Sequence, residues 1–332
     1  VGARPRAKAP TRGNVAGRAA GTASYFFHPN TMAFMQDAPM LRPLGVGDIV
    51  DRVFGIYRAR PLLFVTVAAI PYLLLVLFAA VLGSAFAGSF LALAPLLASP
   101  DDVTELLPTL GPAIAALALY ALVVAIGALL VSLVQSAALV DATAARYLGR
   151  DTTVGRSLRV GLRASPRLLA MGVLALLAFI VLWIVAVAVI AATREWYSVV
   201  GGVIAAIVGT FYLAASWMVS PAVATLEGIG PLAALRRSWG LSDGQRWRII
   251  GTIALLLVLQ VVLTALLSFV LLVSFVTDET LRLVLQQVVN LLAAIAWAPV
   301  YWGTFAVLYY DLRVRKEAYD LQLAAEALPR EG

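Results

Sequence analysis

Six long stretches of the chain carry no charged residue, and this feature most restricts what the chain can fold into. The stretches are residues 61–100, 112–140, 168–193, 199–226, 249–277 and 283–310. A helix of about 20 apolar residues crosses the roughly 30 Å hydrocarbon core of a bilayer, so each stretch is long enough to span a membrane. The chain is 62% hydrophobic and 13% charged, whereas soluble domains are about half apolar and about one quarter charged. The sequence therefore predicts an all-α integral membrane protein with six transmembrane helices.

The lysine and arginine residues are concentrated in alternate segments between these predicted spans. Of the 25 residues, 23 lie before the first span or after the second, fourth and sixth spans, and the other two are Arg194 and Arg282. Residues 84–111 contain no basic residue and carry three acidic ones, Asp101, Asp102 and Glu105. Because basic loops are retained in the cytoplasm, this distribution predicts a protein of the cell (plasma) membrane with both termini cytoplasmic.

Side chains that usually carry metal or nucleophilic chemistry are scarce. The chain has no cysteine, and its one histidine is His28, so cysteine-ligated metals and thiol catalysis are excluded. We expect no metal and no cofactor. The net charge of +7 could suggest nucleic-acid binding, but that function needs a basic face on a soluble module. Here the basic residues flank membrane spans, so nucleic acid is not an expected partner.

Composition divides the chain into three parts. Residues 1–40 are basic and rich in Gly, Ala and Pro, so they are expected to be disordered. Their Arg-rich composition resembles that of a transit peptide. The alternative is that they precede the true translation start at Met32, Met35 or Met40. Residues 41–323 are expected to form the six-span domain, and residues 324–332 a flexible C-terminal tail.

Three basic amphipathic stretches precede pairs of predicted spans. They are residues 41–61, 152–167 and 228–248, and each has a glycine near its start and an arginine just before the following span. Such stretches are typical of helices that lie in the membrane interface. We therefore predict three repeats of one unit, an interfacial helix followed by a transmembrane hairpin. Asp48 and Arg52 have the i,i+4 spacing of an ion pair in the first of these helices.

Three segments resemble a known family. They read LRPLGVGDIVDRVFGIYR from Leu41, SPAVATLEGIGPLAALRRSWGLSDGQRWRIIG from Ser220 and LYYDLRVRKEAYDLQ from Leu308. Together they resemble the bacterial glycerophosphoryl diester phosphodiesterase membrane-domain family over roughly residues 41–323. The motif residues that carry this resemblance are Asp51, Arg52, Glu227, Ser238, Asp311, Arg313, Arg315 and Glu317.

The resemblance implies the membrane module alone. In fusion members of that family, the phosphodiesterase activity belongs to a separate soluble barrel, which uses histidine acid–base chemistry and carboxylates that hold a divalent metal. This chain has no room for such a barrel and no histidine after His28. The resemblance therefore does not imply a phosphodiesterase, and we expect the chain not to be an enzyme.

Two basic clusters are candidate binding sites for anionic lipid of the cytoplasmic leaflet. Arginines at i, i+3, i+7 and one turn further form a stripe, and a second cluster mixes arginine with tryptophan, a residue that prefers the headgroup level. The first consists of Arg156, Arg159, Arg163 and Arg167, and the second of Arg236, Arg237, Trp239, Arg246 and Trp247. Each basic residue near such a leaflet contributes about 1 kcal/mol of attraction. The alternatives are charge that only sets the topology, and anchoring without a ligand.

Charged residues after the fourth and sixth spans are candidate ion pairs. Glu227 could pair with Arg236 or Arg237, could bind a cation, or could cap a helix. A charged helix is expected to run on from the sixth span with three i,i+4 pairs. These pairs are Asp311 with Arg315, Arg313 with Glu317, and Lys316 with Asp320. This helix could dock a partner or pack beneath the spans.

Three functions remain open at the level of sequence. The first is a non-enzymatic lipid-associated scaffold or accessory subunit, with a membrane protein complex as a candidate partner. The second is an uncoupled transporter or lipid translocase with a polar path through the spans, built from Gln135, Gln260, Gln286 and Asn290; the alternative role of these residues is hydrogen bonding between helices. The third, an intramembrane enzyme, would need Asp141, Glu227 and Asp311 to converge.

Overall fold

The structure is a computed structural model that describes residues 43–92, 103–193, 195–272 and 278–326. The predictions for residues 1–40 and for most of the C-terminal tail lie outside these residues. Throughout the described part the chain is helical and contains no strand. The helices are α2 (Val46–Ala59), α3 (Pro61–Ala85), α4 (Ala87–Ala92), α6 (Val103–Tyr147), α7 (Val154–Thr193), α8 (Trp196–Trp217), α9 (Ser220–Leu226), α10 (Pro231–Ser242), α11 (Arg246–Leu272), α12 (Glu279–Glu317) and α13 (Tyr319–Glu326).

Six of the described helical segments are long and apolar enough to cross a membrane, as the sequence predicts. They lie within α3, α6, α7, α8 with α9, α11 and α12. The chain is therefore an all-α, multi-pass membrane protein.

Three helices are much longer than a bilayer requires. α6, α7 and α12 contain 45, 40 and 39 residues, which at 1.5 Å per residue corresponds to about 60 Å. The hydrocarbon core is only about 30 Å thick, so each of these helices extends beyond it. The basic stretch 154–167 is the first part of α7 rather than a separate helix, whereas α2 and α10 are separate helices.

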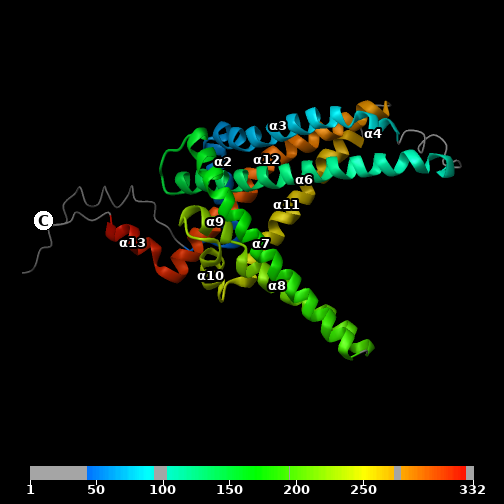
Figure 1. Cartoon of the computed structure of the whole chain (residues 1–332). Helices are drawn as coiled ribbons and strands as arrows, with labels where there is room; N and C mark the ends of the chain where they lie inside the picture. Colours follow the sequence, from blue (N-terminus) through cyan, green and yellow to red (C-terminus); the bar gives the residue numbers. More distant parts are fainter. Residues whose placement is uncertain (1–42, 93–102, 194, 273–277, 327–332) are drawn as a thin grey trace, which may run out of the picture.

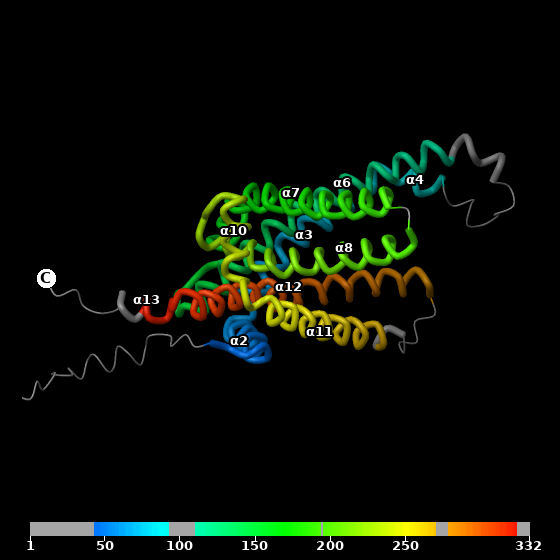
Figure 2. Tube along the Cα trace, turned by 90° about the horizontal axis from the view of Figure 1, so that it is seen from below, coloured from blue at the N-terminus to red at the C-terminus, as the bar shows by residue number. Residues whose placement is uncertain are grey.

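The long helices run away from one end of the molecule (Figures 1 and 2). α3 packs against α6 and α12, α7 packs against α8, and α11 packs against α12. The α7–α8 pair leans away from α3, α6 and α12, so the far ends are splayed (Figure 1). The shared end holds α2, α9 and α10 with the adjoining ends of α6, α7, α11 and α12, and we call it the base.

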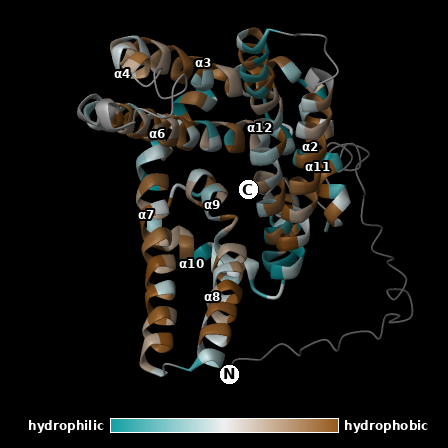
Figure 3. Ribbon diagram, turned by 90° about the vertical axis from the view of Figure 1, so that its right-hand side faces the viewer, coloured by the Kyte–Doolittle hydropathy of each residue, from teal (hydrophilic) through white to brown (hydrophobic). Residues whose placement is uncertain are grey.

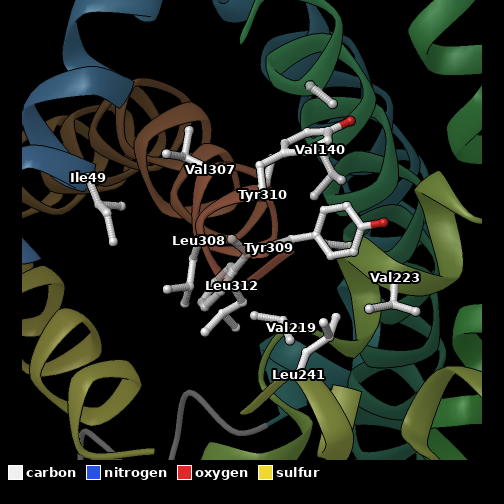
Figure 4. Packing of buried hydrophobic residues seen from close by; sticks show 14 of the residues in the cluster. Ile49, Val140, Val219, Val223, Leu241, Val307, Leu308, Tyr309, Tyr310 and Leu312 are labelled. Atoms are coloured by element: carbon white, nitrogen blue, oxygen red, sulfur yellow. The ribbon is translucent and has the colours of Figure 1, made fainter. Parts of the chain in front are cut away.

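Most of the buried core lies in the base. Figure 4 shows part of it around α12, with side chains from α2, α6, α9, α10 and α12 and from Val219, just before α9. The residues labelled there are Ile49, Val140, Val219, Val223, Leu241, Val307, Leu308, Tyr309, Tyr310 and Leu312. Beyond the base the helices expose large apolar side chains, such as Leu176 of α7 and Phe211 of α8, which are 57% and 64% exposed. Figure 3 shows α7 and α8 apolar along most of their length. Hydrocarbon is the solvent that such surfaces require.

α7 crosses α6 at Gly161. A Cβ atom added at this glycine would lie 2.3 Å from the carbonyl oxygen of Val134 and 3.2 Å from Cβ of Ala138. Small residues of this kind let two helix backbones approach closely. Gly161 therefore sets the distance between two of the longest helices.

Two local expectations from the sequence are wrong. The charged helix does run on from the sixth span, but it ends at Glu317 and does not form its third predicted ion pair, because Ala318 adopts a left-handed conformation (φ 50°) between α12 and α13. Lys316 and Asp320 flank this break, and the described residues contain no ion pair between them. Asp48 does not pair with Arg52 but accepts the backbone N–H of Gly45 at 2.9 Å, because it caps the start of α2.

Candidate functional site

Asp311 is the most buried charged side chain of the base, with 0% of its side chain exposed. Its carboxylate accepts the backbone N–H of Leu44 at 2.7 Å, Nη1 of Arg248 at 2.7 Å and Nε of Arg315 at 3.1 Å. Both arginines also donate to the carbonyl oxygen of Leu44. One carboxylate thus ties the segment before α2 to α11 and α12.

Glu227 belongs to a second polar network, which is a closed loop of five side chains. Glu227 accepts the hydroxyl of Tyr309 at 2.8 Å and Nε of Arg237 at 3.1 Å. Arg237 also bonds to Glu317, whose other oxygen accepts Nε of Arg313 at 3.0 Å. Arg313 closes the loop by donating to the Tyr309 hydroxyl at 3.3 Å. The loop joins the end of α9 and α10 to the last turns of α12, and its two acids balance its two bases.

Arg237 is fully committed to this loop. The hydrogen bonds that it donates to Glu317 and Glu227 raise the pKa of its guanidinium despite the opposing effect of burial. The side chain therefore stays charged and paired, so it is not available to a lipid. Of the two partners that the sequence offered for Glu227, the structure shows Arg237, while Arg236 is exposed on the other side of α10.

A stack of aromatic rings crosses the base. Tyr310 lies between Tyr147 and Tyr319, with ring centroids 5.6 Å and 5.8 Å away. Arg52 covers the outer face of Tyr147 at 5.6 Å and Arg313 covers Tyr319 at 3.8 Å. This stack links α2, α6, α12 and α13, and cation–π contacts at both ends stabilise it.

The second predicted lipid cluster is mostly used inside the protein. Arg246 donates to Oγ of Ser216 at 2.8 Å, pairs with Asp243 at 3.0 Å and lies 4.3 Å from the ring of Tyr212. Trp239 packs on the same tyrosine at 5.5 Å. Ser238, a motif residue, is buried and donates to the carbonyl oxygen of Ser216 at 2.8 Å. The exposed residues of this cluster are Arg236, Trp239 and Trp247, of which Trp247 is 85% exposed and Trp239 36%.

The first predicted cluster, the stripe on α7, has the opposite character. Arg156, Arg159 and Arg163 are exposed, and the described residues hold no ion-pair partner for them. The opposite face of the same helix is buried through residues such as Ser157 and Ala164. Arg167 is half-buried and close to Gly228, where an added Cβ would lie 3.4 Å from its Nη1 atom.

The three acidic residues that an intramembrane enzyme would need bond to different partners. Asp141 accepts the hydroxyl of Ser157 at 2.9 Å, while Asp311 and Glu227 belong to the separate networks described above. Within the described ranges, no group of three His, Cys, Asp or Glu side chains could hold a metal ion.

Each of the four polar residues predicted to line a path through the spans forms a hydrogen bond. Gln135 is buried and donates to the carbonyl oxygen of Ala68 in α3 at 2.9 Å. Gln286 donates to Asn290 at 3.0 Å and Gln260 to Thr264 at 3.4 Å, each within its own helix. Only the Gln135 bond joins two helices, and within the described residues no bond connects two of the four predicted residues on different helices.

Sequence reasoning alone did not identify several members of the networks. Leu44, Arg248 and Tyr309 bond to carboxylates 267, 63 and 82 positions away in the chain. A single sequence carries no signal for such long-range contacts. The near pairs of α12 are different, because i,i+4 spacing marks both Asp311–Arg315 and Arg313–Glu317.

Comparison with known families places the chain in one of them. The family described as a domain of unknown function, DUF8558, matches residues 40–310. The match covers most of the chain, which therefore belongs to this family. No curated protein and no solved structure is significantly similar to it.

Proposed function

We propose that this DUF8558 protein is a non-enzymatic, lipid-associated scaffold or accessory subunit whose base lies at the cytoplasmic surface of the cell membrane. In this arrangement α3–α6, α7–α8 and α11–α12 are three transmembrane hairpins, and α2 and α10 lie in the interface. The basic residues of the base support this orientation by the positive-inside rule. The resemblance to the membrane module of the glycerophosphoryl diester phosphodiesterase family is part of the same proposal, without its catalytic domain.

The observation that carries the proposal is the contrast between the two kinds of arginine in the base. Arg237, Arg246, Arg248, Arg313 and Arg315 are held by acids, carbonyl oxygens or aromatic rings. The three outer arginines of the α7 stripe are exposed and lack such partners within the described residues. Burial of paired charge serves the fold, whereas a row of unpaired guanidinium groups at a membrane surface attracts anionic headgroups.

The networks also favour a scaffold over an enzyme. Their carboxylates are each occupied by arginine or tyrosine donors, as Asp311 and Glu227 show. An acid that accepts several bonds from other helices is suited to holding those helices in place. A rigid base on splayed apolar helices is a shape that can hold lipid and neighbouring membrane proteins in place.

Neutralising the stripe should remove preferential binding of anionic lipid. At about 1 kcal/mol for each residue, the triple change Arg156→Gln, Arg159→Gln and Arg163→Gln should weaken retention of phosphatidylglycerol by about 100-fold. The measurement is native mass spectrometry of the full chain in an equimolar mixture of phosphatidylglycerol and phosphatidylcholine.

The matched control removes the same charge elsewhere on the base. Arg58, Arg60 and Lys316 are also exposed, and their triple change to glutamine should leave most of the retention intact. Equal losses in the two triple variants would show that net charge, not the stripe, attracts the lipid. Unchanged retention in the stripe variant would contradict the proposal outright.

A further inference from the structure

A second polar surface of the base differs in chemistry from the α7 stripe. It is a cleft of about 610 Å³ between α2 and the C-terminal end of α6. Its volume falls within the range of about 300–1,000 Å³ that is usual for small-ligand pockets. α2 leads directly into α3, the first apolar segment, through Arg60 and Pro61, so the cleft lies beside the start of the first candidate membrane span.

The walls of the cleft carry both signs of charge. Asp48, Asp51 and Arg52 line it from α2, and Arg146 and Tyr147 line it from α6. The opposite face of α2 is buried through Ile49, Val50 and Val53, so the helix is fixed against the core and presents its charged face to the cleft. Two carboxylates and two guanidinium groups make the lining neutral overall, unlike the purely basic stripe.

The opposite charges on α2 are held apart rather than paired. Asp48 is engaged by the N–H of Gly45 through its Oδ2 atom, and Arg52 lies over Tyr147. Within the described residues, Asp51 and Arg52 take part in no ion pair, while Arg146 pairs with Asp151 at 2.6 Å. A ligand with one charge would meet repulsion from part of this lining, whereas a zwitterion can contact both Asp51 and Arg52 favourably.

We propose that this cleft binds a phosphoethanolamine group, the headgroup of a zwitterionic phospholipid. Guanidinium groups such as that of Arg52 suit phosphate, because their N–H donors match its oxygen atoms. A primary ammonium group donates hydrogen bonds to carboxylates such as that of Asp51, and a trimethylammonium group has no N–H to donate. The cleft therefore selects phosphatidylethanolamine over phosphatidylcholine because its ammonium group has N–H donors. It selects phosphatidylethanolamine over phosphatidylglycerol because the headgroup carries a positive charge. This inference is independent of the α7 stripe.

Two variants of exposed α2 residues test the proposal. At Gly55, which lines the cleft, an added Cβ meets no atom within 4 Å; Gly55→Leu therefore fills the cleft without disturbing the core. Gly47 is equally open, lies on the same helix and does not line the cleft, so Gly47→Leu is the matched control. Asp51→Asn removes one carboxylate charge, and Asp51→Glu keeps it.

The measurement is native mass spectrometry of the full chain in equimolar phosphatidylethanolamine, phosphatidylcholine and phosphatidylglycerol. The unmodified chain should retain phosphatidylethanolamine in preference to phosphatidylcholine. Asp51→Asn should lower that retention by about tenfold, the effect expected of one lost charge-assisted hydrogen bond. Gly55→Leu should abolish it, while Gly47→Leu and Asp51→Glu should preserve it.

A competition experiment distinguishes a lipid headgroup from a free phosphoethanolamine compound as the ligand of the cleft. Soluble O-phosphoethanolamine that leaves the bound lipid in place assigns the site to the lipid headgroup, and displacement assigns it to the free compound. Wild-type retention of phosphatidylethanolamine in both Gly55→Leu and Asp51→Asn would overturn the proposal, as would the absence of any preference in the unmodified chain. The triple change on the α7 stripe should lower only the retention of phosphatidylglycerol. Failure of one proposed site is therefore distinguishable from failure of the other.

Discussion

Asp311→Asn should lower the free energy of unfolding by about 3–5 kcal/mol, which is the cost of breaking a buried ion pair by removing one partner. Asparagine has nearly the same shape, so the change removes charge and leaves volume alone. Arg248, with 17% of its side chain exposed, would lose its carboxylate and remain mostly buried. The backbone N–H of Leu44 would also lose a charged acceptor.

The consequence reaches three parts of the fold, because Asp311 holds the segment before α2, α11 and α12 together. Unfolding of the purified protein in mixed detergent micelles, followed by circular dichroism, measures the change. Asp243→Asn is the matched control, since this acid also pairs with an arginine but has 65% of its side chain exposed. Exposed pairs contribute about 0–1 kcal/mol, so the control should remain close to the unmodified protein. Equal, small effects of the two changes would contradict the buried network.

Gly161→Ala should destabilise the protein by about 3 kcal/mol, at the upper end of the cost of overpacking a tight contact. The added methyl would lie 2.3 Å from a backbone oxygen of α6, and a backbone atom cannot turn aside as a side chain can. α6 and α7 would have to separate near the point where both enter the base.

Gly172→Ala supplies the control on the same helix. Nothing lies within 4 Å of a Cβ added there, so alanine should stabilise α7 by about 0.5–1 kcal/mol through its higher helix propensity. The two substitutions should therefore change stability in opposite directions in the same unfolding assay. A stabilising effect of Gly161→Ala would show that the close crossing of α6 and α7 does not exist.

The sequence predicts the membrane segments well because their signal is local. Each apolar run is longer than a bilayer requires, so six helices follow from length and composition alone. The pairs Asp311–Arg315 and Arg313–Glu317 are predictable for a similar reason, because one helical turn brings i and i+4 together.

The polar core of the base could not be predicted in this way. Arg248 and Tyr309 reach their carboxylates only after distant helices have packed. Gly161 has no local feature that distinguishes it from the other glycines of the basic stretches. The left-handed conformation of Ala318 is also unexpected, because alanine is the strongest helix former. This conformation turns Tyr319 onto Tyr310. Tertiary packing overrides propensity at that position.

We propose that six apolar segments cross the membrane with the base on its cytoplasmic side. The chain has no cysteine, so a single introduced thiol reports its own location. Asp151, with 85% of its side chain exposed, lies in the base between α6 and α7, and Glu279, with 66% exposed, begins α12 at the far end. With a membrane-impermeant maleimide, Asp151→Cys should react only in inverted membrane vesicles, and Glu279→Cys only in right-side-out vesicles. Reaction of both thiols in the same vesicle orientation would contradict this topology.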